Sequence, residues 1–391
     1  MQIDDVVARI DYSAPQHVRD VISSLGRIED VRFSPNNRRL AVAGLLKNKV
    51  AIFDVSVTTS ANSKQITLTS AHEISSSHLK LPHGLDFIDD EKLIVANREG
   101  HTCVFDLSSD TLGSADMTPL AVIPSDKIAI PGSVRVVKKR QGLYEALICN
   151  SGKNTVTRHL IDLGAGCSIT NNEVLFKKRL NIPDGICLSK EMQWIAVSNH
   201  SAHNVLLYEN TSSLNESSDP DGILRCANYP HGLRFTSDGR FILVADGDLP
   251  YVHIYEKDDA GWRGVRNPLS SFRVLNNDDY LRGRDSRPGE GGPKGIDIHD
   301  ATNIFVTTCQ EQPLAFFDLS AVLESAGTRK NSLDQKALEF KYELYLQDED
   351  NTKLHEAVAA LLAFQNSKSW RITAPLRWIF SALRKITGKS F

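Results

Sequence analysis

The stretch Pro230-His231-Gly232-Leu233, followed by the apolar run Phe241-Ile242-Leu243-Val244-Ala245-Asp246, decides the fold because both parts recur along the chain. The opening phrase occurs in six versions at a spacing of about fifty residues, which is typical of an array of supersecondary units. The six versions are Ile28-Glu29-Asp30-Val31, Pro82-His83-Gly84-Leu85, Pro131-Gly132-Ser133-Val134, Pro183-Asp184-Gly185-Ile186, Pro230-His231-Gly232-Leu233 and Pro293-Lys294-Gly295-Ile296.

The residues after each phrase have a shared order of short apolar runs and polar turns. In the second unit, for example, Leu93-Ile94-Val95-Ala96-Asn97 leads through a turn to Val104-Phe105-Asp106. Such a pattern predicts a small antiparallel sheet for each unit. Sheets of this kind bury their faces by stacking around an axis. The sequence therefore predicts an all-β fold, a six-bladed β-propeller of four-stranded antiparallel blades.

The two ends of the chain are expected to differ in role. The segment with Val18, Val21, Ile22 and Leu25 is predicted to be an outer strand that closes the ring against the last blade. A late strand of that blade is predicted at 342–346. We expect a propeller over residues 1–346 and a short, helical, basic tail over 347–391, with a polar insertion at 276–292 before the sixth phrase.

Composition and charge exclude several classes of protein. Of the 391 residues, 41% are hydrophobic and 24% charged, which is ordinary for a globular chain. No apolar run reaches the length of about eighteen residues that a membrane-spanning helix needs. The net charge of -3, without a basic stripe on the propeller, argues against a nucleic-acid partner. Six scattered cysteines and a start without a secretory signal predict a cytoplasmic location.

The middle residues of the six phrases are expected to meet at one mouth of the central channel, because the first strand of each blade lines it. This ring consists of Glu29, His83, Gly132, Asp184, His231 and Lys294. Those that suit a divalent metal ion are Glu29, His83, Asp184 and His231. Zinc is the best match, with calcium or manganese as alternatives, and Gly132 could leave room for substrate. If a metal binds, Lys294 and His231 are predicted to be catalytic, with Lys294 steadying an anionic group. A metal-free ligand pocket and a purely structural channel lining are the other interpretations.

A second position recurs at the end of the second strand of each unit. The predicted substrate-binding residues at this position are Asn97, Asn150, Asn199 and Asp246. The alternative is structural, because Asn and Asp are common at turns that need a positive φ. Next to this position, His200 and His203 are expected to face solvent. Arg32, Arg135 and Arg234 are expected to pack between blades.

The repeats, above all residues 230–246, resemble the NHL and lactonase-like propellers, a group that includes gluconolactonases, peptidyl-hydroxyglycine amidating lyases and streptogramin lyases. The resemblance covers about residues 20–345 and implies the propeller fold. In gluconolactonases the ring position holds calcium, and Glu29 and Asp184 match that pattern. In the amidating lyases it supplies histidines to zinc, and His83 and His231 look like two of them.

The tail carries basic charge and an apolar stripe. From Ala357 to Phe391 there is no acidic residue. The basic residues there are Lys368, Arg371, Arg377, Arg384, Lys385 and Lys389. Leu376, Ile379, Phe380 and Leu383 follow a helical spacing beside Trp378. These features predict an interfacial helix that binds an anionic membrane. The alternative is a helix packed on the propeller or in a dimer.

The string Ser367-Lys368-Ser369-Trp370-Arg371-Ile372-Thr373-Ala374-Pro375-Leu376-Arg377 resembles the tail of many bacterial glycosyltransferases and methyltransferases of surface-polysaccharide assembly. The resemblance implies a protein at the cytoplasmic face of the inner membrane, beside glycosyltransferase partners. Two hypotheses follow. The first is a binding or scaffold propeller that holds a glycan, a small sugar-derived ligand or a partner enzyme. The second is a metal-dependent lactonase-like hydrolase or lyase with its site at the channel mouth.

Overall fold

The computed structural model describes residues 8–60, 63–108, 111–112, 115–124, 126–164, 166–329, 336 and 339. The chain divides into two compact units, residues 1–335 and 336–391, so the division precedes the predicted boundary at 346. The predicted strand at 342–346 and the predicted tail at 347–391 lie outside the described residues. Among the described residues, no helix is long and apolar enough to span a bilayer.

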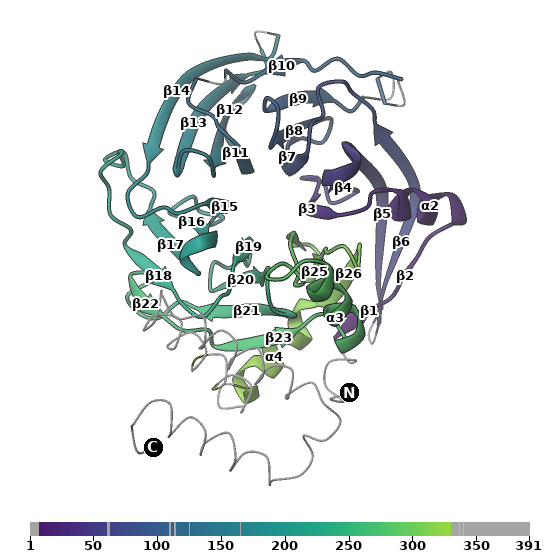
Figure 1. Ribbon diagram of the computed structural model, residues 1–391, viewed down its shortest axis with the longest axis vertical. Coiled ribbons are helices and arrows are strands. Elements are labelled where there is room, and N and C mark those ends of the chain that lie inside the picture. The colour runs from purple at the N-terminus through teal and green to yellow at the C-terminus, as the bar shows by residue number, and fades with distance from the viewer. Residues whose placement is uncertain are drawn as a thin grey trace. The chain divides into compact units, whose positions relative to one another are not determined.

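Six sheets surround a central axis and confirm the propeller (Figure 1). The strands nearest the axis are β3 (Ile28–Phe33), β7 (Pro82–Asp89), β11 (Pro131–Arg140), β15 (Pro183–Leu188), β19 (Pro230–Phe235) and β24 (Ile296–His299). The second strands are β4 (Arg39–Gly44), β8 (Lys92–Asn97), β12 (Leu143–Asn150), β16 (Trp194–Asn199), β20 (Phe241–Asp246) and β25 (Ile304–Thr307). The third strands are β5 (Lys49–Ser60), β9 (Cys103–Asp106), β13 (Thr155–Asp162), β17 (Asn204–Glu209), β21 (Tyr251–Glu256) and β26 (Ala315–Asp318). The fourth strands are β6 (Ser63–Ile74), β10 (Ala121–Val122), β14 (Ser168–Phe176), β18 (Gly222–Leu224), β23 (Ser270–Arg273) and β1 (Arg9–Ile10).

Two blades have a fifth strand, which corrects the prediction of four strands in every blade. In the first blade, β2 (Tyr12–Ser13) lies parallel to β6. In the fourth blade, β22 (Gly264–Arg266) lies parallel to β18 although it belongs to a later part of the chain. Both strands cover an edge of their sheet that would otherwise present unpaired backbone groups.

The N-terminal segment closes the ring, but not through the predicted residues. The pairing of β1 with β26 is antiparallel, with Arg9 opposite Phe317 and Ile10 opposite Phe316. The predicted closing strand is instead part of helix α2 (Gln16–Ser24), which buries Val18 and Ile22. The spacing of these apolar residues by three and four is that of one helical face, so the prediction of a strand was wrong.

The hydrophobic core consists of separate clusters, each between two neighbouring blades. One cluster joins Val31 and Phe53 of the first blade to Val306 and Phe316 of the sixth. Another joins Leu243 and Phe272 of the fifth blade to residues of the sixth. The polar insertion before the sixth blade contains helix α3 (Asn277–Ser286), and helix α4 (Leu319–Arg329) follows β26. Short 3-10 turns occupy Leu45–Lys47 and His200–Ala202.

The glycine of the repeated phrase lets neighbouring inner strands approach closely. A Cβ atom on Gly185 would lie 2.1 Å from the carbonyl oxygen of His231 in the next blade. A Cβ atom on Gly84 would lie 2.4 Å from the Cα atom of Ser133. Neither contact is sterically allowed, so a side chain at either position would push the inner strands apart. The close approach of neighbouring inner strands explains why glycine recurs in the phrase. It also brings the residues at the channel mouth close together.

Candidate functional site

The first strand of five blades is irregular at the middle residue of the phrase. Its pairing with the second strand shifts in register between Ile28 and Asp30, Pro82 and Gly84, Pro131 and Val134, Pro183 and Ile186, and Pro230 and Leu233. A bulge bends the strand and re-aims the side chain of the extra residue. The structure thereby brings together the four predicted metal ligands, Glu29, His83, Asp184 and His231, at the channel mouth.

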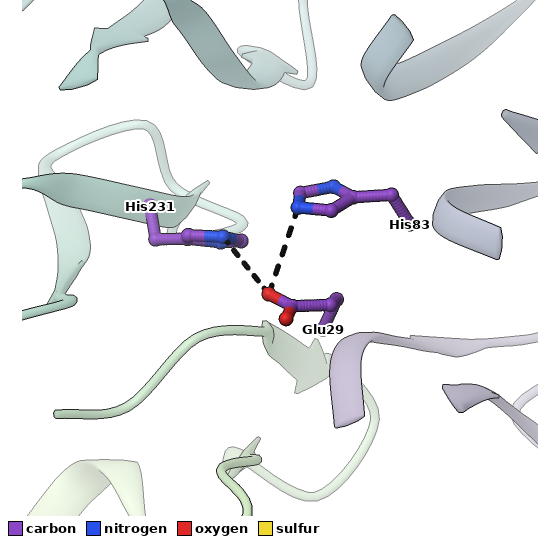
Figure 2. Close-up of side chains that lie close together, drawn as sticks. All are labelled: Glu29, His83 and His231. Carbon is purple, nitrogen blue, oxygen red and sulfur yellow. Dashed lines mark ion pairs between the residues drawn. The ribbon is translucent and has the colours of Figure 1, made fainter. Parts of the chain in front are cut away.

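Glu29 lies between the two histidines (Figure 2). Its Oε2 atom is 3.3 Å from Nε2 of His231 and 3.6 Å from Nε2 of His83. One donor atom from each of these three residues lies within 4.8 Å of the others. Glu29 is fully buried, and Arg27 forms an ion pair with its Oε1 atom. Among the described residues, neither oxygen of Glu29 has a hydrogen-bond partner.

Asp184 extends the cluster on the side of the fourth blade. Its Oδ2 atom is 2.9 Å from Nε2 of His231, and its Oδ1 atom accepts a hydrogen bond of 2.8 Å from Arg98 Nη2. A Cβ atom on residue 132 would lie 2.5 Å from this Oδ1 atom, so only glycine fits there. The space at Gly132 that we expected to admit substrate is therefore taken by the Asp184 carboxylate.

His83 is held as a neutral imidazole. Its Nδ1 atom donates a hydrogen bond of 2.8 Å to the carbonyl oxygen of Gly132, which leaves Nε2 as an acceptor. Arg98 Nη2 donates to this Nε2 atom over 2.7 Å. Burial and the positive charge of Arg98 lower the pKa of His83 to about 3. A histidine whose second nitrogen is fixed by a carbonyl group is the usual arrangement of a metal ligand.

His231 has the opposite protonation state. Burial opposes its protonation, but the carboxylates of Asp184 and Glu29 outweigh burial and raise the pKa of His231 to about 9. Burial would raise the pKa of Glu29, yet His231, His83 and Arg27 hold it well below its usual range. The pKa of Asp184 is also lowered, because His231, His83 and Arg98 outweigh its burial. At neutral pH two carboxylates therefore share one imidazolium.

Lys294, the sixth member of the ring, is buried but not part of the ligand cluster. Its Nζ atom is 3.9 Å from Oε2 of Glu290, which also lies 2.7 Å from Arg27 Nη2. Glu290 belongs to the polar insertion, whose place in the site we did not anticipate. The catalytic role of Lys294 and that of His231 stay predictions.

The residues of the second repeated position make local hydrogen bonds. Asn97, Asn199 and Asp246 each accept one from a backbone N–H two residues before a phrase proline, namely that of Lys80, Asn181 or Asn228. The Asn150 side chain instead donates to the carbonyl oxygen of Ile148 and to Thr157. All four residues are buried. Three of these side chains therefore fix the loop that leads into the first strand of a blade. The substrate-binding role of all four residues stays a prediction.

Three residues of the mouth were missed by sequence reasoning, and two histidines were misplaced. The missed residues are Arg27, Arg98 and Glu290. His200, expected to face solvent, has its ring 6.2 Å from that of His231, and burial lowers its pKa to about 4. His203, also expected to face solvent, is buried, and His200 is half-buried. Arg98 and His200 both directly follow the second repeated position, and this shared register was the available signal.

A second ring lies deeper in the channel, three residues after the first one in each blade. Its members are Arg32, Asp86, Arg135, Cys187, Arg234 and Asp297. Basic residues alternate with Asp86, Cys187 and Asp297, and the closest pair is Arg234 Nε with Asp297 Oδ1 at 2.6 Å. The arginines thus join the inner strands of neighbouring blades through an ionic network. A hollow of about 230 Å³, open solvent included, is lined by the first ring apart from Lys294 and by Arg32 and Arg234 of the second.

No family model matches this chain, and no curated protein matches its sequence. Solved structures do resemble it, and one is a functionally unknown protein from Desulfotomaculum acetoxidans DSM 771. The two chains are 14% identical, with a TM-score of 0.48, over 75% of this chain and 83% of that one. The six-bladed propeller is established by the strand pairing described above.

Proposed function

We propose that the channel mouth binds a divalent metal ion and that the protein is a metal-dependent hydrolase or lyase. One observation carries the proposal: Glu29, His83 and His231, from three different blades, converge with their donor atoms within 4.8 Å of one another. Two imidazoles and one carboxylate are a common zinc set in catalytic sites, where a position stays open for water or substrate. Zinc is therefore the metal that we propose.

The chemistry of the donors fits such an ion. Glu29 is a buried carboxylate held by ion pairs with Arg27 and His231, and among the described residues its oxygens accept no hydrogen bond that a metal ion would have to break. His83 already presents a neutral Nε2 atom. The guanidinium of Arg98 donates to this Nε2 atom and to Asp184, so it occupies the place that a metal ion would take beside His83. Its side chain is 24% exposed, so we expect it to move aside when a metal binds.

Each protein group then has a defined part. A divalent ion supplies a charge that polarises a substrate oxygen and lowers the pKa of water. Asp184, whose Oδ2 atom is 2.9 Å from Nε2 of His231, adds a second negative charge beside the ion once that nitrogen has lost its proton. Arg27 and Lys294 offer positive charge beside the cluster. The substrate that we propose is a small, sugar-derived molecule.

Purified full-length protein should retain close to one equivalent of zinc, manganese or calcium, and a chelator should lower its melting temperature. His231, with a pKa of about 9, must lose its proton to bind the metal. Affinity for zinc should therefore rise about tenfold per pH unit from pH 6 towards 9 and then level off. Metal analysis and competition with a chelating dye measure both. Absence of metal, with an unchanged melting temperature in chelator, would contradict the proposal.

A second candidate is a metal-free binding propeller in bacterial surface-polysaccharide assembly, at the cytoplasmic face of the inner membrane. The contacts of Arg98 with His83 and Asp184 favour it, because a guanidinium already neutralises the site. The eleven-residue string at 367–377 also favours it, although those residues lie outside the described part of the chain. Metal content separates the two candidates.

The membrane part of this proposal predicts that the full-length protein sediments with vesicles containing anionic lipid and is released by salt. Each basic residue near an anionic surface contributes about 1 kcal/mol, and the tail has six. Neutral vesicles serve as the control for apolar binding. Deleting residues 367–391 should abolish sedimentation and leave the melting temperature of the propeller unchanged. Equal sedimentation of the truncated protein would contradict membrane binding by the tail.

A further inference from the structure

A second hollow adjoins the ligand cluster, on the side of the polar insertion. It measures about 310 Å³, open solvent included, and lies among α3, the loop that follows it and the sixth blade. Its lining includes Arg27, Lys294 and Glu290. Arg27 links this hollow to the metal cluster, because its Nε atom contacts Glu29 while its Nη2 atom reaches Glu290.

Lys294 is the unusual group of this hollow. The residue is 3% exposed, and its Nζ atom has no hydrogen-bond partner among the described residues. The carboxylate of Glu290, at 3.9 Å, is too far for a hydrogen bond. A buried ammonium group with three unused donors is costly. The cost is offset if a ligand brings an oxygen anion to this position.

Glu290 shows what kind of group fits. Its Oε2 atom lies between the two cations, 2.7 Å from Arg27 Nη2 and 3.9 Å from Lys294 Nζ. The Glu290 side chain is 34% exposed and belongs to the glycine-rich loop after α3, not to a blade. The loop thus places a carboxylate against two cations of the propeller wall. A carboxylate or phosphate on a ligand has the same charge and the same acceptor oxygens.

We propose that Glu290 is an internal substitute for an anionic group of the substrate, which displaces it and binds to Arg27 and Lys294. The inference rests on the proposed function for the reacting part of the substrate, and it names the substrate class: a sugar derivative with a carboxylate or phosphate group. The anionic group would lie on the other side of the Arg27 guanidinium from Glu29 of the ligand cluster. Binding of the anion requires Arg27 and Lys294 but no metal.

The test is titration calorimetry of full-length protein with inorganic phosphate, sodium glucuronate and glucose, at constant ionic strength. Phosphate and glucuronate distinguish a phosphate from a carboxylate preference, and glucose is the neutral control. Lys294→Met should weaken binding of the preferred anion at least tenfold. Glu290→Gln, which removes the competing charge, should strengthen it about tenfold. Lys178→Met, at an exposed lysine paired with Asp219 on the outer surface, should leave it unchanged.

The opposite directions of the two mouth variants keep the test decisive even if Lys294→Met folds poorly. Glucose that binds as tightly as both anions, or unchanged anion affinity in Glu290→Gln, would overturn the inference. Titrations before and after treatment with a chelator separate it from the proposed function. Anion binding that survives the chelator supports this subsite, and only a protein that holds no metal as purified contradicts the metal centre. A bound metal without anion binding supports the metal centre and contradicts this subsite.

Discussion

Replacing Glu29 by glutamine is expected to lower the affinity of the mouth for zinc by two orders of magnitude or more. Changes to groups that merely support a metal ligand typically cost about 10- to 100-fold, and Glu29 is itself a proposed ligand. The amide has nearly the same shape as the carboxylate but lacks its charge. The two histidines would stay in place, yet the positive charge of Arg27 would no longer be balanced by this residue. Competition with a chelating dye, together with metal content after dialysis, measures the effect.

Glu145→Gln is the matched control for this experiment. Glu145 is a buried glutamate on β12 that pairs with Arg158, remote from the metal cluster. Its replacement should leave zinc affinity unchanged. A Glu29→Gln protein that keeps its metal, with an affinity within several-fold of the wild type, would show that Glu29 is not a ligand.

The largest loss of stability is expected from Arg32→Met. Arg32 is 1% exposed, and its Nη1 atom donates to Asp30 over 2.6 Å and to the carbonyl oxygen of Val31 over 2.8 Å. Asp86 and Asp297 also face its charge. Methionine fills a similar volume but leaves these buried carboxylates without their cation. Breaking a buried ion pair from one side costs about 3–5 kcal/mol, and we expect that loss in the free energy of unfolding.

Urea unfolding at neutral pH measures this loss, with Arg240→Met as the control. Arg240 pairs with Glu256 at the surface, and such pairs contribute about 0–1 kcal/mol. Burial already raises the pKa of Asp30, Asp86 and Asp297, although nearby arginines oppose it. Without Arg32 these values should rise further. The folded variant then binds protons more readily than the unfolded chain, so its deficit should shrink as the pH falls. A loss below about 1 kcal/mol at neutral pH would contradict the burial argument.

Much of the site could be predicted because it follows from the repeat. One residue at the same position in each unit must face the same axis, so Glu29, His83, Asp184 and His231 were predictable as neighbours. The sequence could not show which of the two histidines is protonated. Burial and the charge of Arg98 lower the pKa of His83, whereas Asp184 outweighs burial and raises that of His231. Asp184 and Arg98 lie in another blade or in a loop. The deeper ring of alternating arginine and acidic residues was equally periodic, yet we considered only its three arginines.

The sequence by itself determined the number of blades, the order of the first three strands of each blade and the first ring of residues that face the axis. All of these depend on contacts inside one repeat and on its period. Only the tertiary structure decided the closure by Arg9 and Ile10, the addition of β22 to the fourth blade, and the meeting of Glu290 with Arg27 and Lys294. These contacts join segments far apart in the chain. They form because closing the ring buries edges and charges together, and no local pattern of residues encodes that requirement.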